Sequence, residues 1–217
     1  MEPDNNFEYV IDRFADIKIM RYKVPDFENL TLNRKIFIYY LSQAALCGRD
    51  ILCDQFYRHN LLVRHTIDAI VSSYGGNRES GDFKQFMVYA KRVWFSNGVH
   101  HHYSCDKFFP EISKETFRQL IQDSDTKLLP LNADESAADF ANRVTEIIYS
   151  KSDLKRVSLD SNGDVVMASA NNFYSGVSQA EVEAYNASLP QPDPERPLSN
   201  GLNSRLVKTD GRITEET

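Results

Sequence analysis

The sequence predicts an α+β fold that is mainly helical, with a minor antiparallel β component toward the C-terminus. Between Thr31 and Ile148, apolar residues recur at helical spacing in five stretches. Beyond residue 150 the pattern changes to short alternating runs beside Asn-Gly or Asp-Gly pairs, which favour two-residue hairpin turns. We therefore expect a helical region over residues 1–150. Over residues 151–217 we expect a β-hairpin, a short helix and a proline-rich connector within the same folded unit.

The first predicted helix begins after an N-cap at Thr31 and extends to about Tyr57. Its apolar residues recur near helical spacing, and we expect them to lie in the core. They are Phe37, Tyr39, Tyr40, Leu41, Ala44 and Ile51. Cys47 and Cys53 fall in the same pattern, so we expect both to be small buried packing residues. The charged residues Arg49, Asp50, Asp54 and Arg58 predict an ion-paired helix face rather than an acid and base pair.

Four further stretches predict helices in the remainder of the first region. One spans Asn60 to Ser73 and is stopped by Gly75-Gly76. The next spans Gly81 to Ser96, and Gly98 sits where a left-handed residue would end it. Ser113 can cap a fourth helix, and Asp134 begins a fifth.

The second region predicts two hairpins around one short helix. Alternating residues flank Ser161-Asn162-Gly163, and Ser178 with Glu181 forms a capping box for a helix ending near Ala187. The proline-rich stretch LPQPDPERPL is typical of a semi-rigid connector. A second hairpin turns at Asp210-Gly211, and its last strand has little sequence left to pair with. We therefore expect a fragment of a longer protein, in which the β segment after Val157 exposes an apolar face.

The composition excludes several classes of function. The 217 residues are 41% hydrophobic and 26% charged, with a formal net charge of −6. This acidic balance makes nucleic-acid binding unfavourable, and no apolar run approaches the roughly 18 residues that a membrane span needs. The acidic start MEPDNNFEYV is not a signal peptide, so we expect a cytoplasmic protein, or a periplasmic one if a signal peptide has been removed. Three cysteines without a C-x-x-C pair argue against a disulfide framework or a structural zinc site.

The stretch YAKRVWFSNGVHHHYSCDKFFPE, from Tyr89, is the strongest candidate for a functional site. It holds the only Trp and three of the five His, in a loop that follows a rigid helix. Consecutive residues cannot easily aim three imidazoles at one metal ion, since only His100 and His102 share a face of an extended loop. A metal site, a hydrogen-bonded polar loop and the wall of a ligand cleft all remain open. Motifs for phosphate-binding loops and for Ser or Cys nucleophiles are missing.

Three blocks of the sequence resemble the N-terminal region of dipeptidyl peptidase III. From Phe86, FMVYAKRVWFSNGVHHHYSCDKFFPEISKETFRQLI is similar to a helix of that family that leads into an aromatic loop, an Asp-Lys-Phe-Pro-like stretch and an acidic helix. From Asn171, NNFYSGVSQAEVEAYNASL resembles a later segment of the family. From Phe14, FADIKIMRYKVPDFENLTLNRKIFIYYLSQAALCGRDILCDQ resembles its bacterial, Bacteroides-type branch. The blocks keep the family's order and cover most of the chain.

The resemblance implies a zinc aminopeptidase that removes dipeptides from peptide N-termini. The family has two lobes beside a wide cleft: a helical lobe that carries zinc, and a lobe with a β-barrel core, to which this chain would contribute an incomplete part. The family's zinc helix reads His-Glu-x-x-Gly-His, and a further Glu ligand follows on a later helix. Neither motif occurs here, so the resemblance implies no catalytic residue, metal ligand or cofactor in this chain. Zinc is expected in the full-length parent.

The same resemblance implies that the loop lines part of the substrate cleft. Its candidate substrate-binding residues are Asn97, Tyr103, Ser104 and Cys105, with Tyr103 and Ser104 the strongest of them. The implied partners are a peptide substrate and the missing catalytic lobe. We thus expect the non-catalytic-lobe part of such a peptidase, inactive in isolation; the alternative is a stand-alone peptide-binding module without catalysis.

Overall fold

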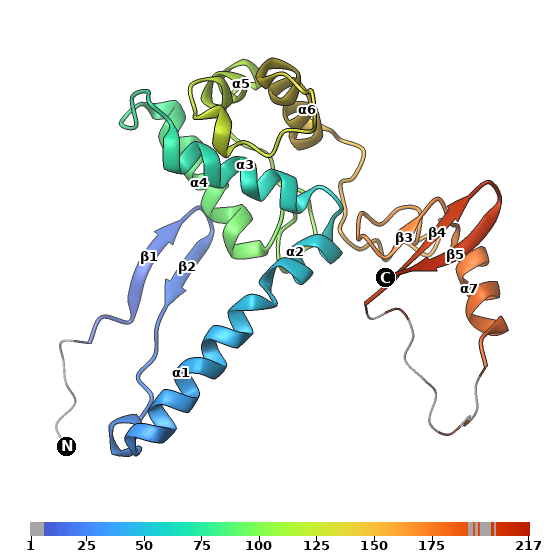
Figure 1. Cartoon of the computed structure of the whole chain (residues 1–217), viewed down its shortest axis with the longest axis horizontal. Helices are drawn as coiled ribbons and strands as arrows, with labels where there is room; N and C mark the ends of the chain where they lie inside the picture. Colours follow the sequence, from blue (N-terminus) through green and yellow to red (C-terminus); the bar gives the residue numbers. More distant parts are fainter. Residues whose placement is uncertain (1–6, 191–192, 194, 196–200, 202) are drawn as a thin grey trace. The chain divides into compact units, whose positions relative to one another are not determined.

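The computed structural model describes residues 7–190, 193, 195, 201 and 203–217, and its contacts divide the chain into two units (Figure 1). The first unit extends to Arg49, and the second runs from Asp50 to Thr217. The change of sequence character near residue 150 therefore falls inside the second unit. The fold is mainly helical α+β, as predicted, and its strands form one two-stranded and one three-stranded sheet within the described residues.

The first unit consists of a β-hairpin, a short 3-10 helix and one long helix. Strand β1 (Val10–Phe14) pairs antiparallel with β2 (Ile17–Met20), and a bulge lies near its start. Residues Phe27–Asn29 form the 3-10 helix η1, and α1 spans Leu32–Cys47 after Thr31, whose side chain makes no capping hydrogen bond. The sequence did not predict this hairpin, because its alternation is short and carries no Asn-Gly or Asp-Gly turn.

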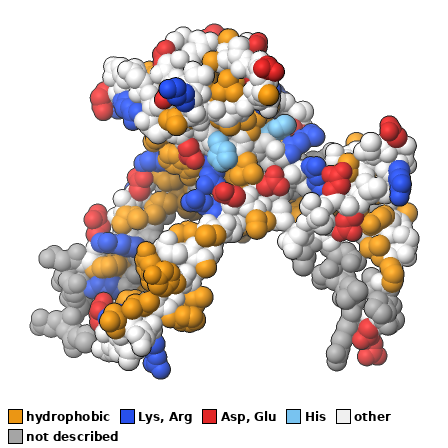
Figure 2. Space-filling model, viewed as in Figure 1, with side chains coloured by type: hydrophobic (Ala, Val, Ile, Leu, Met, Phe, Trp, Pro, Cys, Tyr) orange, Lys and Arg blue, Asp and Glu red, His pale blue; other side chains and the backbone are white. Residues whose placement is uncertain are grey.

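Helix α1 differs from the prediction in its length and in its burial. Gly48 separates it from α2 (Arg49–Phe56), so the single expected helix is two helices. None of its residues is buried: the exposed fractions of Phe37 and Tyr40 are 64% and 65%. The expected core face is therefore wrong, and hydrophobic side chains gather on the surface over α1 (Figure 2). Cys47 is exposed too, whereas Cys53 in α2 is buried as predicted.

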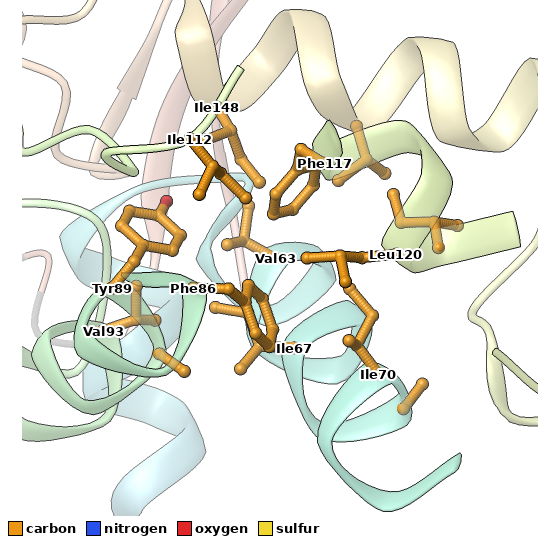
Figure 3. Close-up of a cluster of buried hydrophobic side chains, with 14 of the residues drawn as sticks. Val63, Ile67, Ile70, Phe86, Tyr89, Val93, Ile112, Phe117, Leu120 and Ile148 are labelled. Atoms are coloured by element: carbon orange, nitrogen blue, oxygen red, sulfur yellow. The ribbon is translucent and has the colours of Figure 1, made fainter. Parts of the chain in front are cut away.

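The main core of the second unit is built by four helices that follow α2. These are α3 (Asn60–Ser73), α4 (Gly81–Ser96), α5 (Lys114–Gln122) and α6 (Ala137–Tyr149), with the 3-10 helix η2 (Thr126–Leu128) between the last two. Both α3 and α4 have the predicted bounds. Serine hydroxyls at Ser80, Ser113 and Ser136 accept a backbone N–H of the first turns of α4, α5 and α6. Side chains from all four helices converge in this core, including Ile67, Phe86, Phe117 and Ile148 (Figure 3).

The end of the second unit holds a small mixed sheet and one helix. Strand β3 (Tyr174–Ser175) pairs parallel with β4 (Arg205–Thr209), which pairs antiparallel with β5 (Arg212–Glu216). The predicted turn at Asp210-Gly211 is confirmed, with both residues at positive φ. The capping box before α7 (Gln179–Ser188) is also confirmed. Most of the predicted proline-rich connector lies outside the described residues.

The hairpin predicted around Ser161-Asn162-Gly163 is wrong. Residues on either side of this turn form bends and turns rather than strands. The Asp164 carboxylate accepts backbone N–H groups from Val166, Met167 and Gln179, which holds the segment in a compact turn. Leu159 and Met167 are nonetheless exposed, at 89% and 66%. Within the described ranges, none of the helices combines the length and the apolar character that crossing a lipid bilayer requires.

Candidate functional site

The loop after α4 is tied at its base and projects a short tip, which we call the histidine loop (residues 99–108). The backbone of Phe108 donates to the Val99 carbonyl at 3.0 Å, and a β-bridge joins His100 to Lys107. The His101 amide donates to the Asp106 carbonyl at 2.7 Å. The same loop is also bonded to the segment that follows α6, because Lys107 donates to Leu154 and Arg156 donates to Cys105. Backbone hydrogen bonds thus close the base of the loop and also attach the loop to the segment after α6.

The side chain of Asn60 fixes the point where α4 enters the histidine loop. Asn60 is fully buried, and its Nδ2 donates to the carbonyls of Cys53 at 3.0 Å and of Asn97 at 3.4 Å. Its Oδ1 accepts the Val99 amide at 3.0 Å. One side chain thus links α2, the start of α3 and the end of α4, and this long-range role has no local sequence signature.

The end of α4 differs slightly from the prediction. The left-handed residue is Asn97, with φ of 52°, rather than Gly98. Gly98 has φ of 149° and donates its amide to the Val93 carbonyl. A Cβ atom on Gly98 would overlap the side-chain amide of Asn60, so glycine is required both for its backbone angle and for the close approach.

Two buried ionisable side chains anchor the base of the loop. His100 is 1% exposed, and its Nε2 lies 2.9 Å from the Asp153 carbonyl oxygen. Burial lowers the pKa of His100 below its ordinary value, so the neutral ring is favoured. The Lys107 ammonium donates to the carbonyls of Ile147 and Ser150, both at 2.9 Å, at the end of α6. Burial lowers the pKa of Lys107 as well, while the helix carbonyls give its charge hydrogen-bond partners.

The other two histidines stay with the loop itself. His101 Nδ1 accepts the amides of Tyr103 and Ser104 at 3.2 and 3.1 Å. The His102 ring packs edge-to-face against Phe95, with centroids 4.9 Å apart. Within the described residues, no cluster of three His, Cys, Asp or Glu side chains is placed to hold a metal ion. The rings of His100 and His101 are thus hydrogen-bonded to the backbone, and the ring of His102 packs against Phe95.

The predicted site residues fall into two environments. Tyr103 is 88% exposed at the tip of the loop, next to the exposed Ser104. Cys105 is half-buried with φ of 62°, and its sulfur lies 3.3 Å from an Arg156 guanidinium nitrogen. Asn97 lies at the helix end, where its carbonyl is bound by Asn60. The loop brings Tyr103, Ser104 and Cys105 together, whereas Asn97 belongs to the base.

Sequence reasoning missed a polar cluster below the loop. The Tyr57 hydroxyl donates to Asp153 Oδ2 at 2.8 Å, and the Tyr57 ring packs against His100 with centroids 5.4 Å apart. Asp50 forms an ion pair with Arg64 at 2.5 Å. These partners are far apart in sequence, so no spacing rule could have found them.

No protein-family model matches the chain, and no curated protein matches it either.

The half-buried His59 and the buried His100 predict a pH-dependent stability. Burial lowers the pKa of both His59 and His100, whereas an unfolded histidine titrates near about 6.5. The unfolded chain therefore takes up protons first as the pH falls, so we expect the free energy of unfolding to decrease between about pH 7 and pH 5. Urea unfolding at several pH values measures this loss.

A matched pair of variants assigns the effect. His100→Gln keeps a donor for the Asp153 carbonyl but does not titrate, so it should flatten part of the pH dependence; His65→Gln, at an exposed position of α3, should not. Hydrogen bonds from Arg143 and Lys208 lower the pKa values of Glu135 and Glu181 to about 2, so their contribution to stability is lost mainly below about pH 5, where the unfolded carboxyls take up protons. Equal slopes for wild type and His100→Gln would contradict the prediction.

Proposed function

We propose that this chain forms the N-terminal, non-catalytic-lobe part of a dipeptidyl-peptidase-III-like zinc aminopeptidase and contributes one wall of its peptide cleft. The parent enzyme would release dipeptides from peptide N-termini, and this part would be inactive alone. The observation that carries the proposal is the histidine loop, which presents an almost fully exposed Tyr103 from a firmly bonded base. The proposed compartment is the cytoplasm, with the periplasm as the alternative.

The tip of the histidine loop has the chemistry that peptide binding requires. Tyr103 offers a large rigid aromatic surface with few rotatable bonds, and such residues supply contact area at a low cost in entropy. Phe95 and His102 extend the aromatic surface, and the Ser104 hydroxyl adds a polar group that a peptide backbone can meet. The bonded base keeps these groups in place before a ligand arrives, which lowers the cost of binding.

The exposed α1 favours a part of a larger peptidase over a stand-alone binding module. A helix that is apolar on all sides is normally covered by other elements. Helix α1 carries many large apolar side chains of its own, and none of its residues is buried. A large two-lobed parent would provide a second lobe or further polypeptide that covers α1.

Zinc, in this proposal, is held outside the present chain. Ring nitrogens of His100 and His101 are already bonded to the backbone of the protein. The described residues contain no ligand cluster that would replace them. This chain would then bind and orient the peptide, and the catalytic lobe would supply the metal and the activated water.

Binding of a short peptide tests the role of Tyr103. We expect the chain to bind a tetrapeptide weakly and Tyr103→Ala to weaken binding about tenfold, or about 1.4 kcal/mol. Stability should be unchanged, because the side chain is 88% exposed. Tyr22→Ala, at another exposed tyrosine in the first unit, is the control and should bind as the wild type does. Equal affinities for wild type and Tyr103→Ala would remove the proposed contact.

Activity and gene sequence test the peptidase parent separately. With added zinc, the chain should not cleave a dipeptidyl arylamide; chelator-sensitive turnover would contradict the proposal. Sequencing the gene downstream of the Thr217 codon should reveal a His-Glu-x-x-Gly-His motif. A stop codon directly after Thr217 would instead support the stand-alone binding module.

A further inference from the structure

A polar cavity of about 230 Å³ lies in the second unit between the end of α2 and the segment that forms β3, and we call it the Tyr57 cavity. It is distinct from the histidine loop: its lining includes Tyr57, Arg58, Asp153, Tyr174 and Ser175. The amide of Asn172, another lining residue, donates to the Gln55 carbonyl at 2.8 Å and joins the two sides. The volume is far above the roughly 10–15 Å³ that one water molecule needs.

Asp153 supplies the negative charge of the cavity. Its Oδ2 accepts the Tyr57 hydroxyl at 2.8 Å and the Ser152 hydroxyl at 3.3 Å. Burial, followed by this bond to Asp153, raises the pKa of Tyr57, so the phenol remains a donor and holds the carboxylate in place. Among the described residues, no group donates to Asp153 Oδ1, which leaves one acceptor oxygen for a ligand.

Arg58 supplies a positive charge that does not pair with Asp153. Within the described ranges, Arg58 forms no ion pair, although a guanidinium offers five donors and suits a carboxylate. Arg58 directly follows Tyr57 in the chain, whereas Asp153 is bonded to the far, phenolic end of the Tyr57 side chain. The Asp153 carboxylate is therefore separated from the backbone of Arg58 by about the length of a tyrosine side chain. Opposite charges kept apart in one cavity suit a ligand that carries both charges itself.

We propose that the Tyr57 cavity binds a small zwitterion, a free amino acid or a dipeptide, with its ammonium group at Asp153 and its carboxylate at Arg58. The exposed side of Arg58 would allow entry, and the hydroxyls of Tyr174 and Ser175 on β3 would complete the polar wall. Arg205 also lines the cavity, but its guanidinium is 3.1 Å from Glu216 and is already paired. This inference does not depend on the proposed peptidase function.

Titration with five simple probes tests the proposal on the complete chain. Glycine, L-alanine and glycylglycine carry both charges, while acetate and ethylammonium carry one each. In two-dimensional NMR, the zwitterions should shift the amide signals of residues around Tyr57 and Asn172. The affinity for the zwitterions should be at least tenfold higher than the affinity for either single ion. Equal binding of acetate or ethylammonium would overturn the proposal, as would no binding of any zwitterion at tens of millimolar.

Two substitutions and their controls assign the charges. Arg58→Gln and Asp153→Asn should each weaken glycine or glycylglycine binding at least tenfold, and Asn at position 153 can still accept the Tyr57 hydroxyl. Arg212→Gln and Asp82→Asn remove the same charges at exposed positions outside the cavity and should leave affinity unchanged. If Asp153→Asn lowers stability, Arg58→Gln still decides the result, because Arg58 is exposed. Unchanged affinity in Arg58→Gln would overturn the proposal.

Discussion

Replacement of Gly98 by alanine should lower the free energy of unfolding by about 3 kcal/mol or more, the largest single-residue effect that we expect outside the hydrophobic core. Gly98 has φ of 149°, a backbone conformation that residues with a Cβ atom rarely adopt. The added Cβ would also overlap the buried Asn60 amide. Displacement of that amide would leave the Cys53 carbonyl and the Val99 amide without partners, at about 1–3 kcal/mol each.

Urea unfolding of two alanine variants checks this prediction. Gly163→Ala is the matched control, since a Cβ there meets no atom within 4 Å and the turn is exposed. It should change the free energy of unfolding by no more than about 0.5 kcal/mol. A double variant isolates the clash: in an Asn60→Ala background, Gly98→Ala should cost clearly less than in the wild type. Equal costs in both backgrounds would show that Asn60 is not the obstacle.

Exposed apolar residues on α1 should make the isolated chain self-associate at micromolar concentrations. Removal of two of them, in Phe37→Glu with Leu41→Lys, should weaken association more than tenfold. Each large apolar side chain contributes about 1.5–3 kcal/mol when it is fully buried. Glu four residues before Lys also supports the helix, and the net charge is unchanged. Sedimentation velocity over a range of concentrations measures the association.

The control for α1 uses exposed apolar residues of the second unit. Leu159→Glu with Met167→Lys removes two side chains that are as exposed as those of α1, yet they stand in a turn and not on a continuous apolar helix. This double variant should associate as the wild type does. A wild-type chain that stays monomeric at a concentration on the order of 100 micromolar would contradict the prediction.

The helices of the second unit could be predicted because their signals are local. In α3 and α4 apolar residues at helical spacing are followed by glycine residues, so the bounds of both helices could be predicted to the residue. The same kind of pattern failed for α1, because periodicity identifies apolar residues but does not show what covers them. The prediction of a hairpin at Asn162-Gly163 failed for another local reason. The carboxylate of Asp164 accepts hydrogen bonds from backbone amides that would otherwise pair in a strand.

The position of the histidine loop could be predicted from the sequence, whereas the side chains that hold the loop could not. Its composition and its place after α4 identified the loop, and the spacing of His100 to His102 argued against a shared metal ion. The groups that hold the loop are distant in sequence: Asn60 bonds across 39 residues to Val99, and His100 across 53 to Asp153. Such contacts depend on how helices pack, which a single sequence does not reveal.

The bonded base of the histidine loop has an evolutionary consequence. Its hydrogen bonds join residues 99–101 to 106–108 and leave Tyr103 and Ser104 exposed at the tip. Substitutions at these two positions should be tolerated by the fold, so ligand preference there can drift or be selected without a matching cost in folding. The loop is accordingly a natural place to graft new recognition sequences, and a library randomised at these positions should retain the wild-type melting temperature in most of its members.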